Sequence, residues 1–179
     1  GGEPFVRKDF VSFLEMLSFN DLLEDINITT NGALISNHID RLEKLKKVKN
    51  INLSIDSLKA ATFNEITRRN VFDEVFKTLE TLEKSSLNLK LNVVVQSGIN
   101  TNEILDFVAL TKHKNIAVRF IEEMPFNGKG QREMKENWSY TKILNEIKSR
   151  FSVKKIVSEK SSTSHNFSIE NESVLKSFF

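Results

Sequence analysis

The chain has 179 residues, and its 26 Lys and Arg against 24 Asp and Glu leave a formal net charge of only +2. This length suffices for one domain with a substantial core, but a closed barrel of eight strand–helix units takes about 250 residues. Charges of both signs are interspersed, so the sequence lacks the clustered basic stripe typical of nucleic-acid-binding proteins. We therefore expect one domain and no nucleic-acid partner.

Membrane and secretion signals are absent from the sequence pattern. No apolar run approaches the roughly 20 residues of a membrane span, and no signal-peptide pattern opens the chain. We therefore expect a cytoplasmic protein with no membrane partner. The sequence contains no cysteine, so it offers no thiolate for an iron–sulfur cluster.

Helix and strand patterns alternate along the chain. In chain order we predict a helix at 10–17, a strand at 26–30, a helix at 39–48, a strand at 51–56, a helix at 72–82, a strand at 89–96, a helix at 104–108, a strand at 117–124 and a helix at 143–147. Asn100, with Glu103 three residues later, resembles a helix cap. Strands separated by helices of this length indicate parallel βαβ units, wound into a doubly wound sheet or part of a barrel.

The predicted strands are polar on one face, although strands buried in a parallel sheet are apolar on both. The polar positions are Asn27, Thr29, Asn31, Asn52, Ser54, Asp56, Lys90, Asn92, Arg119 and Glu123. An antiparallel sheet with one solvated face would give the same alternation, but the intervening helices need an apolar sheet face to cover. Burying so many unpaired polar groups would cost about 1–3 kcal/mol each. We therefore favour a partly open barrel whose polar face points inward, around water and a charged ligand.

Lys90 and Arg119 are the side chains that we assign to an anionic ligand. The planar guanidinium group suits phosphate or carboxylate, and the ammonium group acts as a compact point charge. The alternative is a buried salt bridge with Asp56, Glu122 or Glu123. No group of His, Asp or Glu has metal-ligand spacing, so we assign neither a metal site nor a catalytic residue.

The chain reads as a barrel domain at 1–157 followed by a C-terminal extension at 158–179. The serine-rich stretch at 158–164 is the best candidate for a mobile segment. No linker, low-complexity segment or repeat of fixed period divides the rest of the chain.

Six segments, in order, resemble motifs of the GTP 3′,8-cyclases, a family of radical S-adenosylmethionine (SAM) enzymes. They are GGEP at 1–4 with RKD at 7–9, TTNG at 29–32, NLSIDSL at 52–58, ITRR at 66–69 with FD at 72–73, KLNVVV at 90–95 with GIN at 98–100, and VRFIE at 118–122 with MP at 124–125. The resemblance implies an α/β fold, a partial TIM-type (βα)6 radical SAM barrel that is incomplete at both ends. The family's two cysteine motifs are missing from this chain, and the tail at 171–179 departs from the family pattern.

The resemblance also implies an activity, that of a lyase in molybdenum cofactor biosynthesis. Two [4Fe–4S] clusters serve the intact enzyme, and one of them reduces SAM to a 5′-deoxyadenosyl radical. The radical takes the 3′ hydrogen of GTP, and C3′ then attacks C8 of the guanine, which gives (8S)-3′,8-cyclo-7,8-dihydroguanosine 5′-triphosphate. Because the cluster ligands are absent, we expect this chain alone to be inactive.

Site residues follow from the resemblance, position by position. Gly2 is expected to contact SAM through its backbone, and Ser54 and Met124 to line the SAM site. Thr29 and Lys90 are expected to contact GTP. Without the resemblance, a cap would be the preferred role of Thr29 and core packing that of Met124.

Three further residues are assigned to the pocket without a specific ligand: Glu3, Asn92 and Arg119. The resemblance implies GTP as substrate, an electron donor and a downstream pterin-forming enzyme as partners, and it allows a homodimer. Two other functions stay open, a different radical SAM enzyme and a non-catalytic nucleotide-binding fragment.

Overall fold

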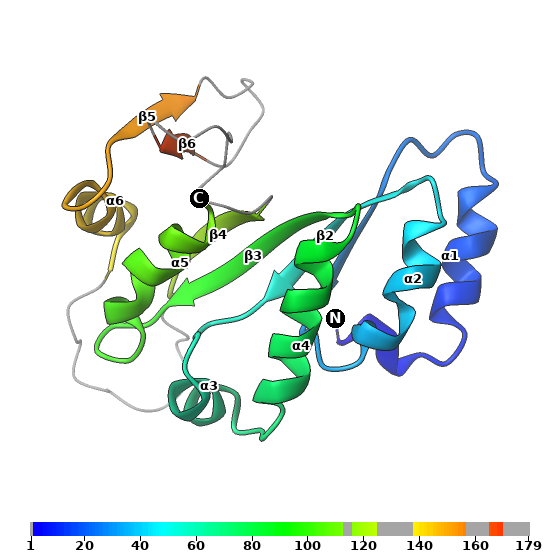
Figure 1. Ribbon diagram of the computed structural model, residues 1–179, viewed down its shortest axis with the longest axis horizontal. Helices are drawn as coiled ribbons and strands as arrows, with labels where there is room; N and C mark the ends of the chain where they lie inside the picture. Colours follow the sequence, from blue (N-terminus) through cyan, green and yellow to red (C-terminus); the bar gives the residue numbers. More distant parts are fainter. Residues whose placement is uncertain (1, 113–115, 125–137, 157–164, 170–179) are drawn as a thin grey trace.

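The computed structural model describes residues 2–112, 116–124, 138–156 and 165–169 (Figure 1). The helices are α1 (Phe10–Ser18), α2 (Ile39–Glu43), α3 (Ala60–Thr67), α4 (Phe72–Lys84), α5 (Ile104–Leu110) and α6 (Tyr140–Lys148), with 3-10 turns η1 (Pro4–Val6), η2 (Ile35–His38) and η3 (Thr101–Glu103). The strands are β1 (Ile26–Thr30), β2 (Val48–Ser54), β3 (Asn88–Val95), β4 (Ile116–Glu122), β5 (Val153–Ile156) and β6 (Asn166–Ile169). Among these residues no helix is long and apolar enough to cross a membrane.

The main sheet has four strands in the order β1-β2-β3-β4, and all neighbouring pairs are parallel. Each strand is connected to the next through helix, as the alternating pattern predicted. The antiparallel alternative is therefore wrong for this sheet. The arrangement is an α/β fold that corresponds to part of a barrel.

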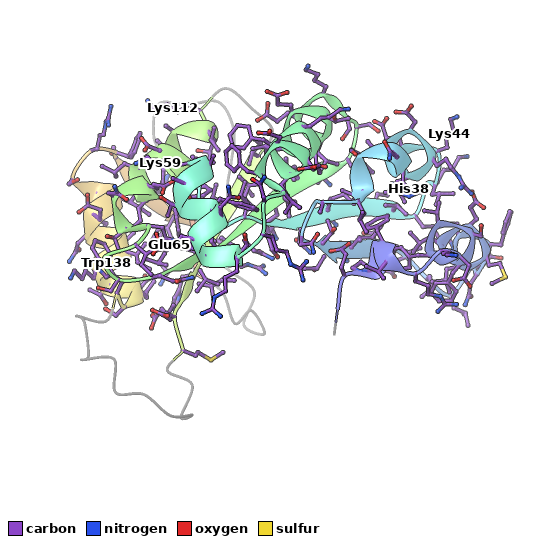
Figure 2. All side chains as sticks on the ribbon, turned by 90° about the horizontal axis from the view of Figure 1, so that it is seen from below. His38, Lys44, Lys59, Glu65, Lys112 and Trp138 are labelled. Atoms are coloured by element: carbon purple, nitrogen blue, oxygen red, sulfur yellow. The ribbon has the colours of Figure 1, made fainter. Side chains whose placement is uncertain are left out.

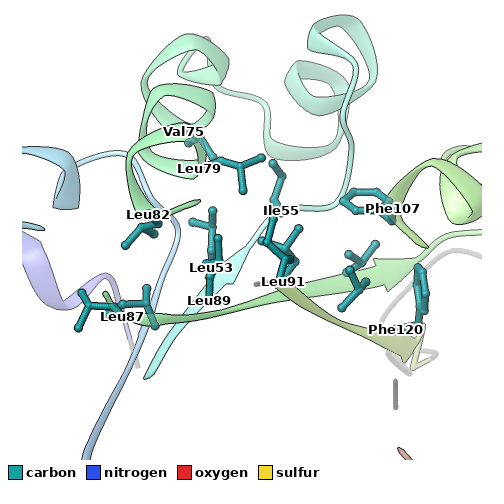
Figure 3. Close-up of a cluster of buried hydrophobic side chains, with 14 of the residues drawn as sticks. Leu53, Ile55, Val75, Leu79, Leu82, Leu87, Leu89, Leu91, Phe107 and Phe120 are labelled. Atoms are coloured by element: carbon teal, nitrogen blue, oxygen red, sulfur yellow. The ribbon is translucent and has the colours of Figure 1, made fainter. Parts of the chain in front are cut away.

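The apolar face of the sheet forms the core with the helices that cover it (Figure 3). Leu53 and Leu91 from the strands are fully buried, and Val75 and Leu79 of α4 pack over this face. Burial of each such side chain stabilises the fold by about 1.5–3 kcal/mol. The ladder of hydrogen bonds and this helix layer together fix which side chains remain on the opposite, polar face.

Two sequence predictions of helices need correction. The helix predicted at 39–48 ends at Glu43, and Val48 instead begins β2 and pairs with Ile26. The apolar spacing continued through a turn at Leu45, where the Val48 amide donates to the Leu45 carbonyl at 2.9 Å. Helix α3 was not predicted, because its mixed polar and apolar residues give a weak period.

A two-stranded antiparallel sheet, β5 with β6, was also not predicted. Both strands are four residues long, too short to show an alternating pattern. Strand β6 lies within the segment assigned to the C-terminal extension and pairs with β5 of the preceding segment. The predicted mobile stretch at 158–164, and the boundary beside it, lie outside the described residues and stay predictions.

Candidate ligand-binding face

One polar row crosses the sheet through Thr29, Asn52 and Lys90, which are aligned in the register of β1, β2 and β3. The Asn52 amide donates to the Thr29 hydroxyl, with Nδ2 and Oγ1 3.3 Å apart. Thr29 therefore belongs to the polar face and does not cap a helix. The two residues predicted to contact GTP, Thr29 and Lys90, lie at the two ends of this row.

A second polar row lies one step nearer the carboxyl ends of the strands. It joins Ser54, Asn92 and Arg119 across β2, β3 and β4. The side-chain oxygen of Asn92 is buried but accepts no hydrogen bond. A buried acceptor without a donor is unfavourable by about 1–3 kcal/mol, so this atom is a place where a ligand or water donor would stabilise the fold.

Side-chain amides stabilise the same face at the amino ends of the strands. Asn50 donates to Asn27 and accepts from Asn88, whose Nδ2 lies 3.1 Å from the Asn50 oxygen. In this row the polar side chains therefore form hydrogen bonds with one another. The rows nearer the carboxyl ends leave Lys90, Asn92 and Arg119 available for a ligand.

The polar face is open rather than enclosed in the part of the chain that the structure describes. Thr29 and Ser54 are exposed, whereas Lys90, Asn92 and Arg119 are half-buried. The prediction that the polar residues share one face is confirmed for those that lie in the strands, whereas Asn31, Asp56 and Glu123 lie beyond the strand ends. Enclosure of this face as a barrel interior is not seen among the described residues. The helices described here pack on the apolar face, so among the described residues no helix covers the polar one.

Lys90 and Arg119 face no carboxylate among the residues described. The two ion pairs found there join Arg7 to Asp9 and Arg41 to Glu15. Burial lowers the pKa of Lys90, and the nearby positive charge of Arg119 lowers it further. The salt-bridge alternative is therefore wrong within these residues, and the two cations are suited to an anion from outside the chain.

Two of the three carboxylates that could have neutralised these cations have other partners. Asp56 accepts the Val94 amide at 2.8 Å, and burial raises the pKa of this carboxyl. Glu122 accepts the Tyr140 amide at 2.6 Å, at the start of α6. Glu123 is exposed.

The residues predicted to contact SAM lie at segment ends near the carboxyl edge of the sheet. Gly2 is exposed, and a Cβ added there would meet no atom within 4 Å. Met124, just after β4, is 71% exposed, so its side chain does not pack in the core. Both positions leave space for a ligand.

Glu3 was predicted as a pocket residue, but its carboxylate is already engaged by the protein. It accepts from the Thr30 hydroxyl at 2.7 Å, the Asn31 amide at 2.7 Å and the Phe5 amide at 3.2 Å. Glu3 therefore holds the segment after Gly2 against the end of β1.

Sequence analysis did not predict the buried polar cluster around Glu103, which lies behind the second polar row. Glu103 is fully buried and accepts from the Ser57 hydroxyl, at 2.9 and 3.0 Å, and from the Leu58 amide at 2.7 Å. Asn100 donates to the backbone oxygens of Asp56 and Val94. The pair read as a helix cap thus binds the connection after β2 instead. No local sequence signal indicates this contact, because Ser57 and Glu103 are 46 residues apart.

The structure brings together no group of three or more His, Cys, Asp or Glu that could hold a metal ion, within the described ranges. With no cysteine in the sequence, the chain supplies no thiolate to an iron–sulfur cluster. What the face offers is hydrogen-bonding groups and two cations, which fits an anionic organic ligand.

Comparison with known proteins gives many relatives. The chain is 40% identical over 173 residues to molybdenum cofactor biosynthesis protein 1 of Dictyostelium discoideum, covering 96% of this chain and 26% of that protein. It is 38% identical over 172 residues to a mitochondrial GTP 3′,8-cyclase of Arabidopsis thaliana, covering 95% of this chain and 44% of that protein. The chain thus spans less than half the length of these two relatives.

A solved structure and a family model agree on the fold. Streptococcus suis SuiB bound to S-adenosylmethionine aligns with a TM-score of 0.55 at 20% identity, over 83% of this chain and 34% of that chain. At this identity the likeness shows the fold alone. The model of the radical SAM superfamily matches residues 1–111. Since that match covers more than half of the 179 residues, the chain belongs to the radical SAM superfamily.

Proposed function

We propose that this chain is the SAM- and GTP-binding part of a GTP 3′,8-cyclase in molybdenum cofactor biosynthesis. The observation that carries the proposal is the polar face, where half-buried Lys90 and Arg119 lack a carboxylate partner in the described chain beside the orphaned oxygen of Asn92. A nucleotide triphosphate and a methionyl carboxylate are anions that such a face would hold. The name of the Arabidopsis relative, a GTP 3′,8-cyclase, supports GTP among the nucleotides.

SAM is proposed to bind at the carboxyl edge of the sheet, along Gly2, Ser54 and Met124. The open space beside Gly2 lets a ligand approach the backbone closely. The exposed side chain of Met124 offers an apolar contact. SAM, together with an iron–sulfur cluster, supplies the radical chemistry of the family, and this chain has no cysteine to ligate that cluster.

GTP is proposed to bind along the first polar row. Thr29 offers a hydroxyl at one end, and Lys90 offers a charge for the triphosphate at the other. Arg119 and Asn92 lie one row further, where they can orient an anionic group and donate or accept a hydrogen bond. These side chains would bind and orient the substrate, and the face must be shielded from water for the reaction.

Direct binding measurements test this proposal. Isothermal titration of the 179-residue chain with GTP and with SAM should detect both ligands. Lys90→Ala should weaken GTP binding at least about tenfold, since charge-assisted hydrogen bonds contribute about 1.5–3 kcal/mol. Lys77→Ala, on the exposed surface of α4, is the matched control and should bind as the wild type does.

The outcome also separates the alternative functions. Binding of SAM without GTP would favour a radical SAM enzyme that acts on another molecule, and binding of GTP without SAM would favour a nucleotide-binding fragment. Failure to bind either ligand, or equal GTP affinity in Lys90→Ala and wild type, would contradict the site assignment. The homodimer, the electron donor, the pterin-forming partner and the cytoplasmic location stay predictions.

A further inference from the structure

Glu3 joins two segments that are far apart in the sequence. Its Oε1 accepts from the Thr30 hydroxyl at 2.7 Å, and its Oε2 accepts from the Asn31 amide at 2.7 Å. Through Phe5 it also fixes the start of η1, since the Phe5 amide lies 3.2 Å from Oε1. Three donors thus converge on one carboxylate, which uses both of its oxygens.

This contact continues into the helix layer. The Thr30 hydroxyl, which donates to Glu3, accepts from the Gly32 amide at 3.1 Å. The Gly32 carbonyl accepts from the Thr78 hydroxyl of α4 at 2.7 Å. Thr30 and Thr78 are buried and Glu3 is half-buried, so the inner hydrogen bonds of this chain are shielded from water and hold their geometry firmly.

The two segments that Glu3 joins lie next to the two proposed ligand positions. Gly2 precedes Glu3 directly, and Thr29 precedes Thr30 directly in β1. Side chains alternate along a strand, so Thr30 points into the core while Thr29 lies on the polar face. Holding the Thr30 side chain therefore also holds the strand backbone that turns Thr29 toward the polar face.

We propose that Glu3 is a positioning residue that couples the two ligand positions, so that SAM bound at Gly2 strengthens GTP binding at Thr29 and the reverse. The inference rests on the proposed function. When one ligand orders the segment that it contacts, the Glu3 carboxylate also orders the other segment. The second ligand then binds to a site that is already ordered. A carboxylate is required because Gln would turn an amide N–H toward one of the donors.

The coupling is measured as the ratio of SAM dissociation constants without and with saturating GTP, by isothermal titration of the 179-residue chain. In the wild type we expect a ratio of about fivefold or more, the lower end of typical allosteric coupling. Glu3→Gln should bring the ratio close to one. Thr30→Val, which removes the donating hydroxyl but keeps the side-chain shape, should do the same and serves if Glu3→Gln does not fold.

Glu43→Gln is a matched control, because Glu43 also binds a backbone amide and a hydroxyl. Its Oε1 accepts from the Ser86 amide at 2.6 Å and the Ser86 hydroxyl at 3.0 Å, just before β3 begins. Glutamine keeps an amide oxygen that can accept both hydrogen bonds, so this variant removes the carboxylate charge without unpairing a donor and should keep the wild-type ratio.

Each result has one meaning. A wild type that binds both ligands with a ratio of one, or a Glu3→Gln or Thr30→Val chain with the wild-type ratio, overturns the coupling and leaves the proposed function intact. Loss of coupling in Glu43→Gln as well would also overturn it, because the effect would then follow from removing a carboxylate elsewhere in the fold. A wild type that binds neither ligand overturns the proposed function itself.

Discussion

Lys90 and Arg119 place two positive charges on one face of neighbouring strands, and no carboxylate of the described residues pairs with either. Burial, followed by the charge of Arg119, lowers the pKa of Lys90. A lysine whose pKa falls on folding destabilises the folded state while it is charged in both states. The free energy of unfolding should therefore rise as the pH rises from the lowered pKa toward the ordinary 10.5.

Lys90→Met should accordingly stabilise the ligand-free chain slightly at neutral pH while weakening GTP binding. The methionine keeps the apolar stem but removes the charge that burial and Arg119 disfavour. Thermal unfolding without ligand checks the first effect, and the shift of the midpoint by GTP checks the second. A lower midpoint without ligand in Lys90→Met than in wild type would contradict this account of the lysine.

The sequence predicted the parallel βαβ order and the polar face because both follow from periods that local residues carry. Thr29, Asn52 and Lys90 alternate with apolar neighbours, and the register places them in one row. The partners of buried polar groups could not be predicted, since they join residues distant along the chain. Glu3 and Glu103 were read as a pocket residue and a cap, but each binds the segment at the end of a strand that folding brings to it.

Gly2 and Gly32, two of the glycines in the motifs, differ in what an added methyl group would meet. Gly32 has φ of +82°, and its Cβ would lie 2.5 Å from Leu53 Cδ1. Gly32→Ala should lower the free energy of unfolding by about 1–2 kcal/mol from the left-handed backbone and about 1–3 kcal/mol from overpacking. Gly2→Ala meets open space, and it should change stability by less than about 0.5 kcal/mol.

Urea unfolding of both glycine variants checks this contrast. Since Gly2 is proposed to contact SAM, Gly2→Ala should weaken SAM binding despite its normal stability. Equal stability of the two variants would show that the turn after β1 adapts to a side chain at Gly32.

Glu103→Gln tests the buried cluster behind the second polar row. Glutamine replaces one acceptor oxygen by an amide that faces the donors Ser57 and Leu58. The loss should be about 1–3 kcal/mol, because a buried donor loses its acceptor. Glu65→Gln, on the exposed surface of α3 (Figure 2), is the control and should change stability by less than about 0.5 kcal/mol. Similar unfolding midpoints for both variants in urea would contradict the role of Glu103.

Asp56 should give the stability of the chain a pH dependence of its own. Burial raises the pKa of this carboxyl above 3.8, and the hydrogen bond from the Val94 amide opposes the rise. An acid whose pKa rises on folding destabilises the folded state once it is ionised in both states. The free energy of unfolding that Asp56 contributes therefore falls as the pH rises from 3.8 through the raised pKa.

Asp56→Asn removes this charge, and its side-chain oxygen can still accept from the Val94 amide. The variant should gain stability relative to wild type as the pH is raised, with little difference near pH 4 and the full difference at neutral pH. Urea unfolding at both pH values measures it, with Asp106→Asn on the exposed surface of α5 as control. An equal difference in the free energy of unfolding between Asp56→Asn and wild type at both pH values would contradict this prediction. It would mean that the hydrogen bond from the Val94 amide compensates the burial of the carboxylate fully, so that the end of β2 holds its charge without cost.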